Sequence, residues 1–362
     1  MAYNLSAALL GDAGRNAAGV LVFSGFALLG SFMGVIFLHK YFFIRQRLDR
    51  MLEIYPLLAE PPQTGKNRGS GAGKTGELII SGLRRTRRNQ TVNPTINPTM
   101  NQPMSTIDIG VNLMHRSFQR DREQVVERAA ARGVSPLIIT GTSLRSSAEA
   151  ARYAGDFPGK LYATAGVHPH DAKGCNEETI DKLRELAQLP QVVAIGECGL
   201  DYNRDFSPRD VQRKWFAEQI RLALDLNLPL FLHEREASGD FTSILKEHGV
   251  KRAVVHCFTG TEAELKTYLA MGFHIGITGW ICDERRGRHL LDLVPIIPPD
   301  RLMIETDAPF LTPRDMKDKP ADRRNEPAFL PHIVETIARC TGRTAAEIAE
   351  MTTQTAREFF GI

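Results

Sequence analysis

The sequence predicts an α/β protein whose folded part, residues 105–362, is a (β/α)8 barrel of the TIM type. Three observations lead to this prediction. Short apolar runs rich in β-branched residues recur every 20 to 40 residues, and amphipathic stretches with helical periodicity separate them. Polar residues stand at the ends of four runs, where the mouth of a barrel would bring them together. A doubly wound open sheet is the alternative. Polar residues at the ends of four separate strands favour a sheet that closes into a barrel, because closure brings them together.

Eight of these runs are expected to form the strands. They are IDIGVNL (107–113), PLIITGT (136–142), YATAGVH (162–168), VVAIGECGL (192–200), LPLFLHE (228–234), AVVHCF (253–258), HIGITGW (274–280) and LMIETDA (302–308). The stretches between them, such as NEETIDKLRELAQL and DVQRKWFAEQIRLALDLN, are expected to be helices. Several end near Gly or Asn, which commonly terminate helices.

Residues 1–60 hold an uncharged apolar run at 17–38, long enough to cross a hydrocarbon core of about 30 Å as a helix. Four Lys and Arg residues follow this run and one Arg precedes it, so the positive-inside rule puts the downstream chain in the cytoplasm. The segment therefore predicts a transmembrane helix that anchors a cytoplasmic protein to the inner membrane face. A buried core helix is the alternative.

Residues 61–104 are rich in Pro, Gly, Asn, Thr and Arg and predict a disordered basic linker. The GSGAGKT segment inside it lacks the first glycine of a phosphate loop, because Arg68 stands there, and no apolar strand precedes it. The linker ends at Met104, and MSTIDIGVNL reads like a natural beginning. Translation from Met104 is therefore one hypothesis for the amino-terminal segment, and a genuine membrane anchor is the other.

The net charge of +3 is unevenly distributed along the chain. Residues 1–104 carry 12 Lys and Arg against 5 Asp and Glu, whereas residues 105–362 carry 33 against 37. The barrel thus has no global basic field, and any nucleic acid must be bound locally and through metal. Five scattered cysteines without CxxC spacing indicate a reducing compartment more than a disulfide framework.

Two carboxylates and two imidazoles at strand ends predict a hydrolytic metal centre, because such donors converging from separate segments can hold a divalent ion. Each could instead be structural, as an ion-paired carboxylate or a satisfied core histidine. The candidate ligands are Glu197, His233, His256 and Asp307. Asp307 could alternatively orient the attacking water as a general base.

Further polar residues near the strand ends are candidates for substrate contacts. Asp201 could hold a ligand through a hydrogen bond, and His168 and His170 could contact a phosphate or leaving group or simply pack the loop. Guanidinium groups suit phosphate, and those in question are Arg235, Arg285 and Arg286. Tyr202 and Trp280 could stack nucleobases or only pack the rim.

In these residues the chain resembles the TatD-type metal-dependent deoxyribonucleases of the amidohydrolase-like TIM-barrel superfamily. The motifs AGVHPH, AIGECGLDYNRDFS, LFLHER, HCFTG and IETDAPFLTPRD carry the resemblance, in order, across the barrel. It implies that Glu197, His233 and His256 bind the ion, with Asp307 as ligand or base. It also implies magnesium as the most frequent ion, with manganese or zinc as alternatives, and 3′–5′ exonuclease activity on single-stranded DNA or RNA.

One departure concerns the first strand, where most of that family has H-x-H. Here Gly110 and Asn112 stand at those positions, and only Asn112 offers a weak neutral oxygen. We therefore expect one firmly held ion, with a second supported by substrate phosphate and water. The competing hypotheses are a hydrolase of small amides or esters on the same scaffold and a catalytically weak, membrane-tethered binding protein.

Overall fold

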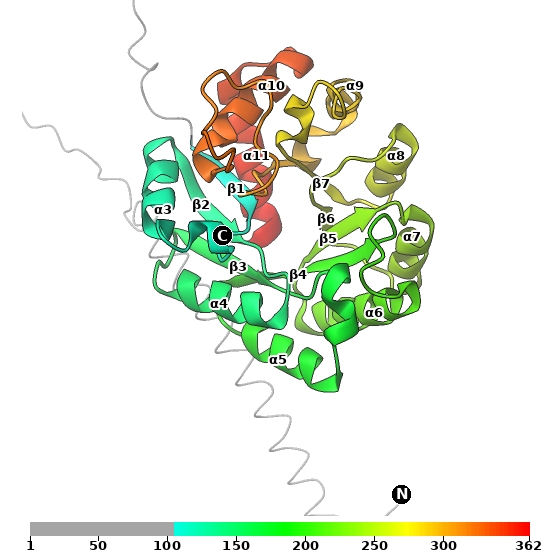
Figure 1. Cartoon of the computed structure of the whole chain (residues 1–362). Helices are drawn as coiled ribbons and strands as arrows, with labels where there is room; N and C mark the ends of the chain where they lie inside the picture. Colours follow the sequence, from blue (N-terminus) through cyan, green and yellow to red (C-terminus); the bar gives the residue numbers. More distant parts are fainter. Residues whose placement is uncertain (1–104) are drawn as a thin grey trace, which may run out of the picture. The chain divides into compact units, whose positions relative to one another are not determined.

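The computed structural model describes residues 105–362, which form a single parallel sheet of eight strands (Figure 1). The strands neighbour one another in chain order, and every adjacent pair is parallel. The expected eight strands are thus confirmed. They are β1 (Thr106–Val111), β2 (Val134–Ile139), β3 (Leu161–Ala165), β4 (Val192–Asp201), β5 (Leu230–Arg235), β6 (Ala253–Val255), β7 (His274–Ile277) and β8 (Leu302–Ile304).

Backbone hydrogen bonds between β1 and the segment after β8 close this sheet into a barrel. The Asp307 N–H donates to the Gly110 carbonyl at 2.8 Å, and the Asn112 N–H donates to the Ala308 carbonyl at 2.7 Å. A doubly wound open sheet, whose first and last strands would lie apart, is excluded by these contacts. Closure matters for function because it brings the carboxyl ends of all strands around one mouth.

A helix follows each strand, and α3 to α8 lie outside the ring of strands (Figure 1). The helices are α3 (Arg122–Ala131), α4 (Leu144–Gly155), α5 (Glu177–Ala187), α6 (Arg209–Leu226), α7 (Ser238–Glu247), α8 (Glu262–Ala270), α9 (Leu290–Leu293), α10 (Leu330–Thr341) and α11 (Ala345–Phe360). Capping boxes begin α4, α5, α8 and α11, where Ser143, Asn176, Thr261 and Thr344 satisfy backbone N–H groups of the first turn. Short 3-10 turns complete the connections: η2 (Arg116–Phe118), η3 (Pro169–Gly174), η4 (Gly279–Cys282), η5 (Val294–Ile296), η6 (Pro299–Arg301) and η7 (Pro327–Phe329).

Two apolar clusters hold the barrel together. The larger lies between the strands and the surrounding helices, and the smaller joins inward residues such as Ile109, Phe231 and Met303. Phe359 and Phe360 of α11 pack into the smaller cluster. The interior of the barrel is therefore a filled core. The polar residues at the carboxyl ends of the strands line the mouth of the barrel.

Strands β4 and β5 approach each other unusually closely at two glycines. A Cβ on Gly196 would lie 2.1 Å from the Phe231 carbonyl oxygen, and one on Gly199 would lie 1.8 Å from the His233 carbonyl oxygen. Both glycines have φ near +145°, which L side chains rarely adopt (+143° and +148°). This approach sets Glu197, between the two glycines, against His233 of the neighbouring strand.

The predicted transmembrane helix at 17–38 and the predicted linker at 61–104 lie outside the described residues. Among residues 105–362, none of the helices combines the length and apolarity needed to span a bilayer.

Candidate metal centre

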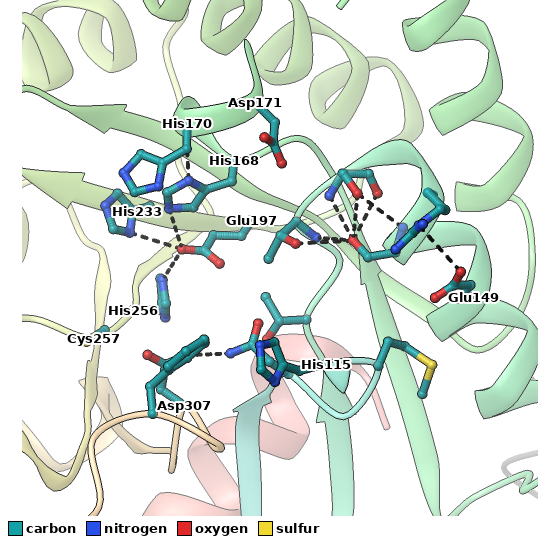
Figure 2. A pocket seen from close by; sticks show the side chains of 18 of the residues that line it. His115, Glu149, His168, His170, Asp171, Glu197, His233, His256, Cys257 and Asp307 are labelled. Carbon is teal, nitrogen blue, oxygen red and sulfur yellow. Dashed lines mark hydrogen bonds and ion pairs between the residues drawn. The ribbon is translucent and has the colours of Figure 1, made fainter. Parts of the chain in front are cut away.

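A cavity of about 710 Å³ opens at the carboxyl ends of the strands (Figure 2). It collects seven of the residues singled out from the sequence, although they span almost 200 positions of the chain. These residues are Asn112, His168, His170, Glu197, His233, His256 and Asp307.

Glu197 is the centre of this site, because three imidazoles point at one of its carboxylate oxygens (Figure 2). Glu197 Oε1 lies 2.7 Å from His256 Nε2, 3.0 Å from His233 Nδ1 and 3.3 Å from His168 Nε2. The side chain of Glu197 is only 6% exposed. A buried carboxylate without compensation is costly, so the imidazoles are what makes this position tolerable.

The charges of this group support one another. Burial alone would raise the pKa of Glu197, but the neighbouring His256 and His168 hold that pKa well below its usual value. Burial alone would lower the pKa of His256, but Glu197 and Glu305 raise that pKa well above its usual value. The pKa of His233 is likewise raised, against burial, by hydrogen bonds to Asp201 and Glu197. Glu197 is therefore an anion at neutral pH, as a metal ligand must be.

His168 differs from the other two imidazoles in its protonation. Its Nδ1 accepts a hydrogen bond from the His170 N–H at 3.1 Å, so the proton of the neutral ring sits on Nε2 and faces Glu197. Burial lowers the pKa of His168 to about 4, which leaves the ring neutral at physiological pH. In this tautomer His168 is a hydrogen-bond donor to an oxygen, which suits a phosphate contact better than metal ligation.

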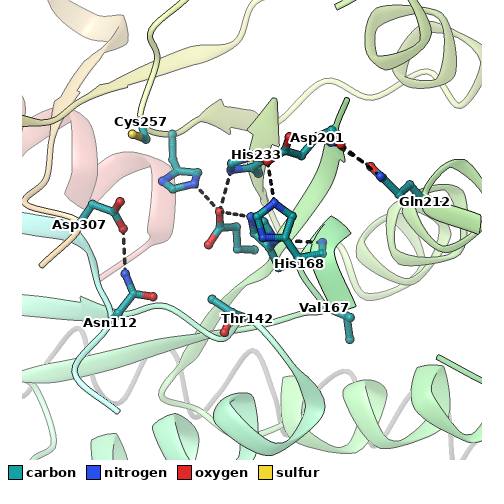
Figure 3. Close-up of polar contacts among 12 residues, drawn as sticks. Asn112, Thr142, Val167, His168, Asp201, Gln212, His233, Cys257 and Asp307 are labelled. Atoms are coloured by element: carbon teal, nitrogen blue, oxygen red, sulfur yellow. Dashed lines mark hydrogen bonds and ion pairs between the residues drawn. The ribbon is translucent and has the colours of Figure 1, made fainter. Parts of the chain in front are cut away.

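Asp201 supports the histidines from behind. Its Oδ2 lies 2.7 Å from His170 Nε2 and 3.5 Å from His233 Nε2, while its Oδ1 accepts the N–H groups of Asn203 and Arg204. Gln212 of α6 fixes the Asp201 backbone through two hydrogen bonds (Figure 3). The role in orienting a ligand that the sequence suggested for Asp201 stays a prediction, to which these contacts give a possible geometry.

Asp307 faces the same cavity from the opposite, β1–β8 side (Figures 2 and 3). Its Oδ1 accepts a hydrogen bond from Asn112 Nδ2 at 2.8 Å. Withdrawal from water raises the pKa of Asp307 to about 7, although the nearby His256 opposes the shift. A carboxyl group of this kind can exchange a proton near neutral pH, as a general base does.

Glu305 is a site residue that the sequence analysis missed. It is completely buried, its Oε1 accepts the Cys257 N–H at 2.6 Å, and its Oε2 lies 3.4 Å from His256 Nδ1. The signal was present in the sequence, since Glu305 is the first acidic residue of the ETD motif that ends the last strand. A carboxylate at one nitrogen of a histidine orients the ring and leaves the other nitrogen to face the site.

Glu305 also explains why glycine occupies position 110. A Cβ on Gly110 would lie 2.1 Å from Glu305 Oε2, so the Glu305 carboxylate fills the space that any side chain at position 110 would need. Glycine at position 110, where most of the family has a histidine, therefore goes together with the buried position of the Glu305 carboxylate. At position 112 the Asn112 side chain holds Asp307.

The arginines predicted to bind phosphate contact other protein groups. Arg285 and Arg286 pair with Asp283 at 3.5 and 2.8 Å, and Arg235 stands 5.8 Å from the centre of the Trp280 ring. None of the three lines the cavity, and their assignment to phosphate stays a prediction. Two arginines that the sequence analysis did not consider, Arg116 and Arg145, do line it. They lie in η2 and at the start of α4, where hydrophobic periodicity gives no functional signal.

The donor set fits a divalent metal. His168, Glu197 and His233 each offer an atom within 4.8 Å of the others, and the buried His233 Nε2 has only a long contact of 3.5 Å to Asp201 Oδ2. A divalent cation could replace the proton of such a histidine, because a metal-bound imidazole is neutral. A second group, Cys282, Asp315 and His332, also has ligand spacing but lies outside this cavity.

Fold and site together define a hydrolase of the metal-dependent TIM-barrel class. The profile of the family described as TatD related DNase matches residues 107–361, and the chain belongs to that family. The chain is 53% identical over 257 residues to the 3′-5′ ssDNA/RNA exonuclease TatD of Rahnella sp. (strain Y9602), covering 70% of this chain and 98% of that relative. It is 50% identical over 257 residues to the 3′-5′ ssDNA/RNA exonuclease TatD of Escherichia fergusonii, with the same coverage.

Solved structures resemble the barrel at lower identity. The TatD homolog YJJV from Escherichia coli K12 has a TM-score of 0.67 at 26% identity, covering 72% of this chain and all of that one. A TatD family hydrolase from Entamoeba histolytica has a TM-score of 0.65 at 29% identity, covering 71% and 98%. The resemblance stated from the motifs is therefore confirmed, and so is a hydrolytic nuclease as the kind of enzyme.

Proposed function

We propose that this chain is a divalent-metal-dependent 3′–5′ exonuclease that hydrolyses phosphodiester bonds of single-stranded DNA and RNA. The observation that carries the proposal is the convergence of three imidazole nitrogens on Glu197 Oε1 in a wide cavity that Asp307 also lines. Relatives about half identical, and matched over nearly their whole length, carry this activity in their names.

In the proposed site Glu197, His233 and His256 hold the cation, and Asp307 is either a fourth ligand or the general base. Mg²⁺ is our first choice of cation, and Mn²⁺ or Zn²⁺ are the alternatives. A bound divalent ion would polarise the phosphodiester and lower the pKa of water. Carboxylate oxygens suit Mg²⁺, whereas the two imidazoles would suit Zn²⁺ as well.

The chain's own residues would do the remaining work. Asn112 holds Asp307 Oδ1, which leaves Oδ2 to accept a proton from the attacking water. His168 offers its Nε2–H to a phosphate oxygen, because the His170 N–H occupies its other nitrogen. His170 is held by Asp201 and lines the same wall. Arg116 and Arg145 supply positive charge for the phosphates along the strand.

Small amides or esters are the alternative substrates, and a binding protein without activity is the alternative role. The two arginines in the cavity support an anionic polymer over a small neutral substrate. All five cysteines are free, which supports work in the reducing cytoplasm.

The test is incubation of the full chain with single-stranded DNA or RNA labelled at the 5′ end, in Mg²⁺, Mn²⁺, Zn²⁺ or EDTA. Stepwise shortening of the labelled strand in Mg²⁺, abolished by EDTA, is the expected result. A strand labelled at the 3′ end should release labelled mononucleotide at once. Internal cleavage, or no cleavage with any of the metals, would contradict the proposal.

A further inference from the structure

Two exposed phenylalanines stand at the cavity. Among residues 105–362 the large apolar side chains that remain exposed are Leu189, Phe206, Leu224, Ile296 and Phe310. Phe206 is 55% and Phe310 49% exposed, and these two line the cavity, whereas the three aliphatic ones do not. Apolar surface kept in water at the edge of a functional cavity indicates a ligand with an apolar face.

The two rings lie at opposite ends of the site. Phe206 packs against His170 with ring centres 4.6 Å apart, and Phe310 packs against His115 with ring centres 5.4 Å apart. Figure 2 shows His170 and His115 on opposite sides of Glu197 and His256. A chain that lays one phosphate at the centre would therefore reach an aromatic ring in either direction.

Both rings are mounted on fixed backbone. The residue after Phe206 is the fully buried Ser207, whose Oγ donates to the His170 carbonyl at 2.8 Å and accepts the Lys173 N–H at 3.0 Å. The Phe310 N–H donates to the Asp307 carbonyl at 3.0 Å, and the buried Asn325 donates to the Phe310 carbonyl at 2.7 Å. Because the backbone is already held in place, less conformational entropy of the protein is lost when a ligand stacks on the ring.

The aromatic residues that the sequence suggested for base stacking are occupied by other contacts. The Arg209 guanidinium lies over the Tyr202 ring at 4.3 Å, and the Tyr202 hydroxyl donates to Asp240. The Arg286 guanidinium lies over the Trp280 ring at 4.3 Å. Neither Tyr202 nor Trp280 lines the cavity.

We propose that Phe206 and Phe310 are two nucleobase-binding subsites, which stack the bases on either side of the phosphate at the centre. The inference rests on the proposed function and adds how the substrate is gripped. Every base has a π-face, so stacking binds single strands without selecting sequence. The barrel lacks a global basic field, so base stacking supplies affinity that long-range charge does not.

The test uses the full chain and two oligonucleotides of equal length. One carries all its bases, and the other has abasic sugars at the last two positions of the 3′ end. Phe206→Ala and Phe310→Ala should each raise KM for the intact strand about tenfold, with kcat little changed, because each substitution removes the ring on which one base stacks. On the abasic strand the same substitutions should change KM less than about twofold.

Matched variants separate stacking from other effects. Phe206→Tyr and Phe310→Tyr should keep KM near that of the unmodified protein, and Leu224→Ala, an exposed apolar residue on α6 away from the cavity, should leave both substrates unaffected. Equal losses on the intact and abasic strands, or no loss on the intact strand, would overturn the inference. If the unmodified protein degrades neither strand, the proposed function fails, and binding of the same two strands by fluorescence anisotropy still tests the subsites.

Discussion

Both halves of the site withdraw carboxyl groups from water, but with opposite consequences for the pKa of those groups. In the β4–β6 half, Glu197 and Asp201 are surrounded by histidine nitrogens, and the pKa of each is lowered. In the β1–β8 half, Asp307 at the cavity and Asp108, which is buried in β1 behind it and does not line the cavity, have few cationic partners, and burial raises the pKa of each to about 7. The sign of the shift follows the partners, since burial acts in the same direction in all four.

This difference indicates a division of labour. The β4–β6 half supplies the carboxylate and the imidazoles that we propose as metal ligands, and its histidines would release their protons when a cation binds. The β1–β8 half supplies a carboxyl group, Asp307, that can exchange a proton near neutral pH. The residues at positions 110 and 112 fit this difference, because the Glu305 carboxylate fills the space beside Gly110 and the Asn112 side chain donates to Asp307.

The strongest test of the comparison is Glu197→Gln. The change removes the anion on which three imidazoles converge, so we expect a loss of more than about a thousandfold in kcat/KM. Calorimetry should detect weaker divalent metal binding by the variant. Glu178→Gln, at an exposed glutamate of α5, is the control and should leave both measurements unchanged. Metal affinity equal to that of the unmodified protein would place the ion elsewhere.

Glu305→Gln should have the next largest effect. Glutamine can still accept the Cys257 N–H, but its amide would then donate to His256 Nδ1 and drive the ring proton to Nε2, which faces Glu197. We expect kcat/KM to fall by about 10–100-fold, as for other residues that orient metal ligands. The pattern of His256 nitrogen chemical shifts in NMR should report the changed tautomer. An unchanged tautomer together with full activity would contradict the role assigned to Glu305.

Gly110→Ala tests the packing that replaces the strand-1 histidine. The new methyl group would lie 2.1 Å from Glu305 Oε2, so the buried carboxylate must shift and strain its bonds to Cys257 and His256. We expect the free energy of unfolding to fall by about 1–3 kcal/mol, measured by urea denaturation. Gly239→Ala in α7, where a Cβ meets nothing within 4 Å, should be neutral or stabilising. Equal stabilities would show that Glu305 does not fill the position.

Asp108→Asn tests the comparison through the pH dependence of stability. Burial raises the pKa of Asp108 from its usual 3.8 to about 7, so between these values the folded chain holds a proton that the unfolded chain releases. Stability contributed by this group is complete at low pH and is lost as pH rises towards 7, by up to about 1.4 kcal/mol per pH unit. Asparagine cannot titrate, so the stability of the variant relative to the unmodified protein should rise between about pH 4 and about pH 7 and then level off. A stability difference that is constant over this range would contradict the shift.

The sequence predicted most of the fold but overestimated several strands. The runs at 253–258 and 302–308 were expected to be strands throughout, but β6 ends at Val255 and β8 at Ile304. In both runs the residues that follow the strand turn towards the cavity, and Cys257 and Asp307 adopt φ near +50° (47° and 53°). Apolar alternation cannot reveal this change, because strand and site residues form one continuous motif.

The site was predicted less evenly than the fold. Polar residues at strand ends, such as His233 and His256, stand out against apolar neighbours and could be found by inspection. Glu305 was overlooked because its carboxylate points into the space left by a glycine on a distant strand. Arg116, Arg145 and Phe206 lie in loops or helix starts, where nothing in the local pattern separates a cavity wall from a solvated surface.

By itself the sequence determined the alternation of strands and helices, the candidate ligands at the strand ends and the family to which the motifs belong. The tertiary structure decided which of those groups meet, which nitrogen of His168 carries its proton, and which arginines and aromatic rings face the cavity. The physical reason is that periodicity and propensity act over a few neighbouring residues. Metal ligation, pKa shifts and stacking depend on distances of a few ångströms between side chains that barrel closure brings together from distant parts of the chain.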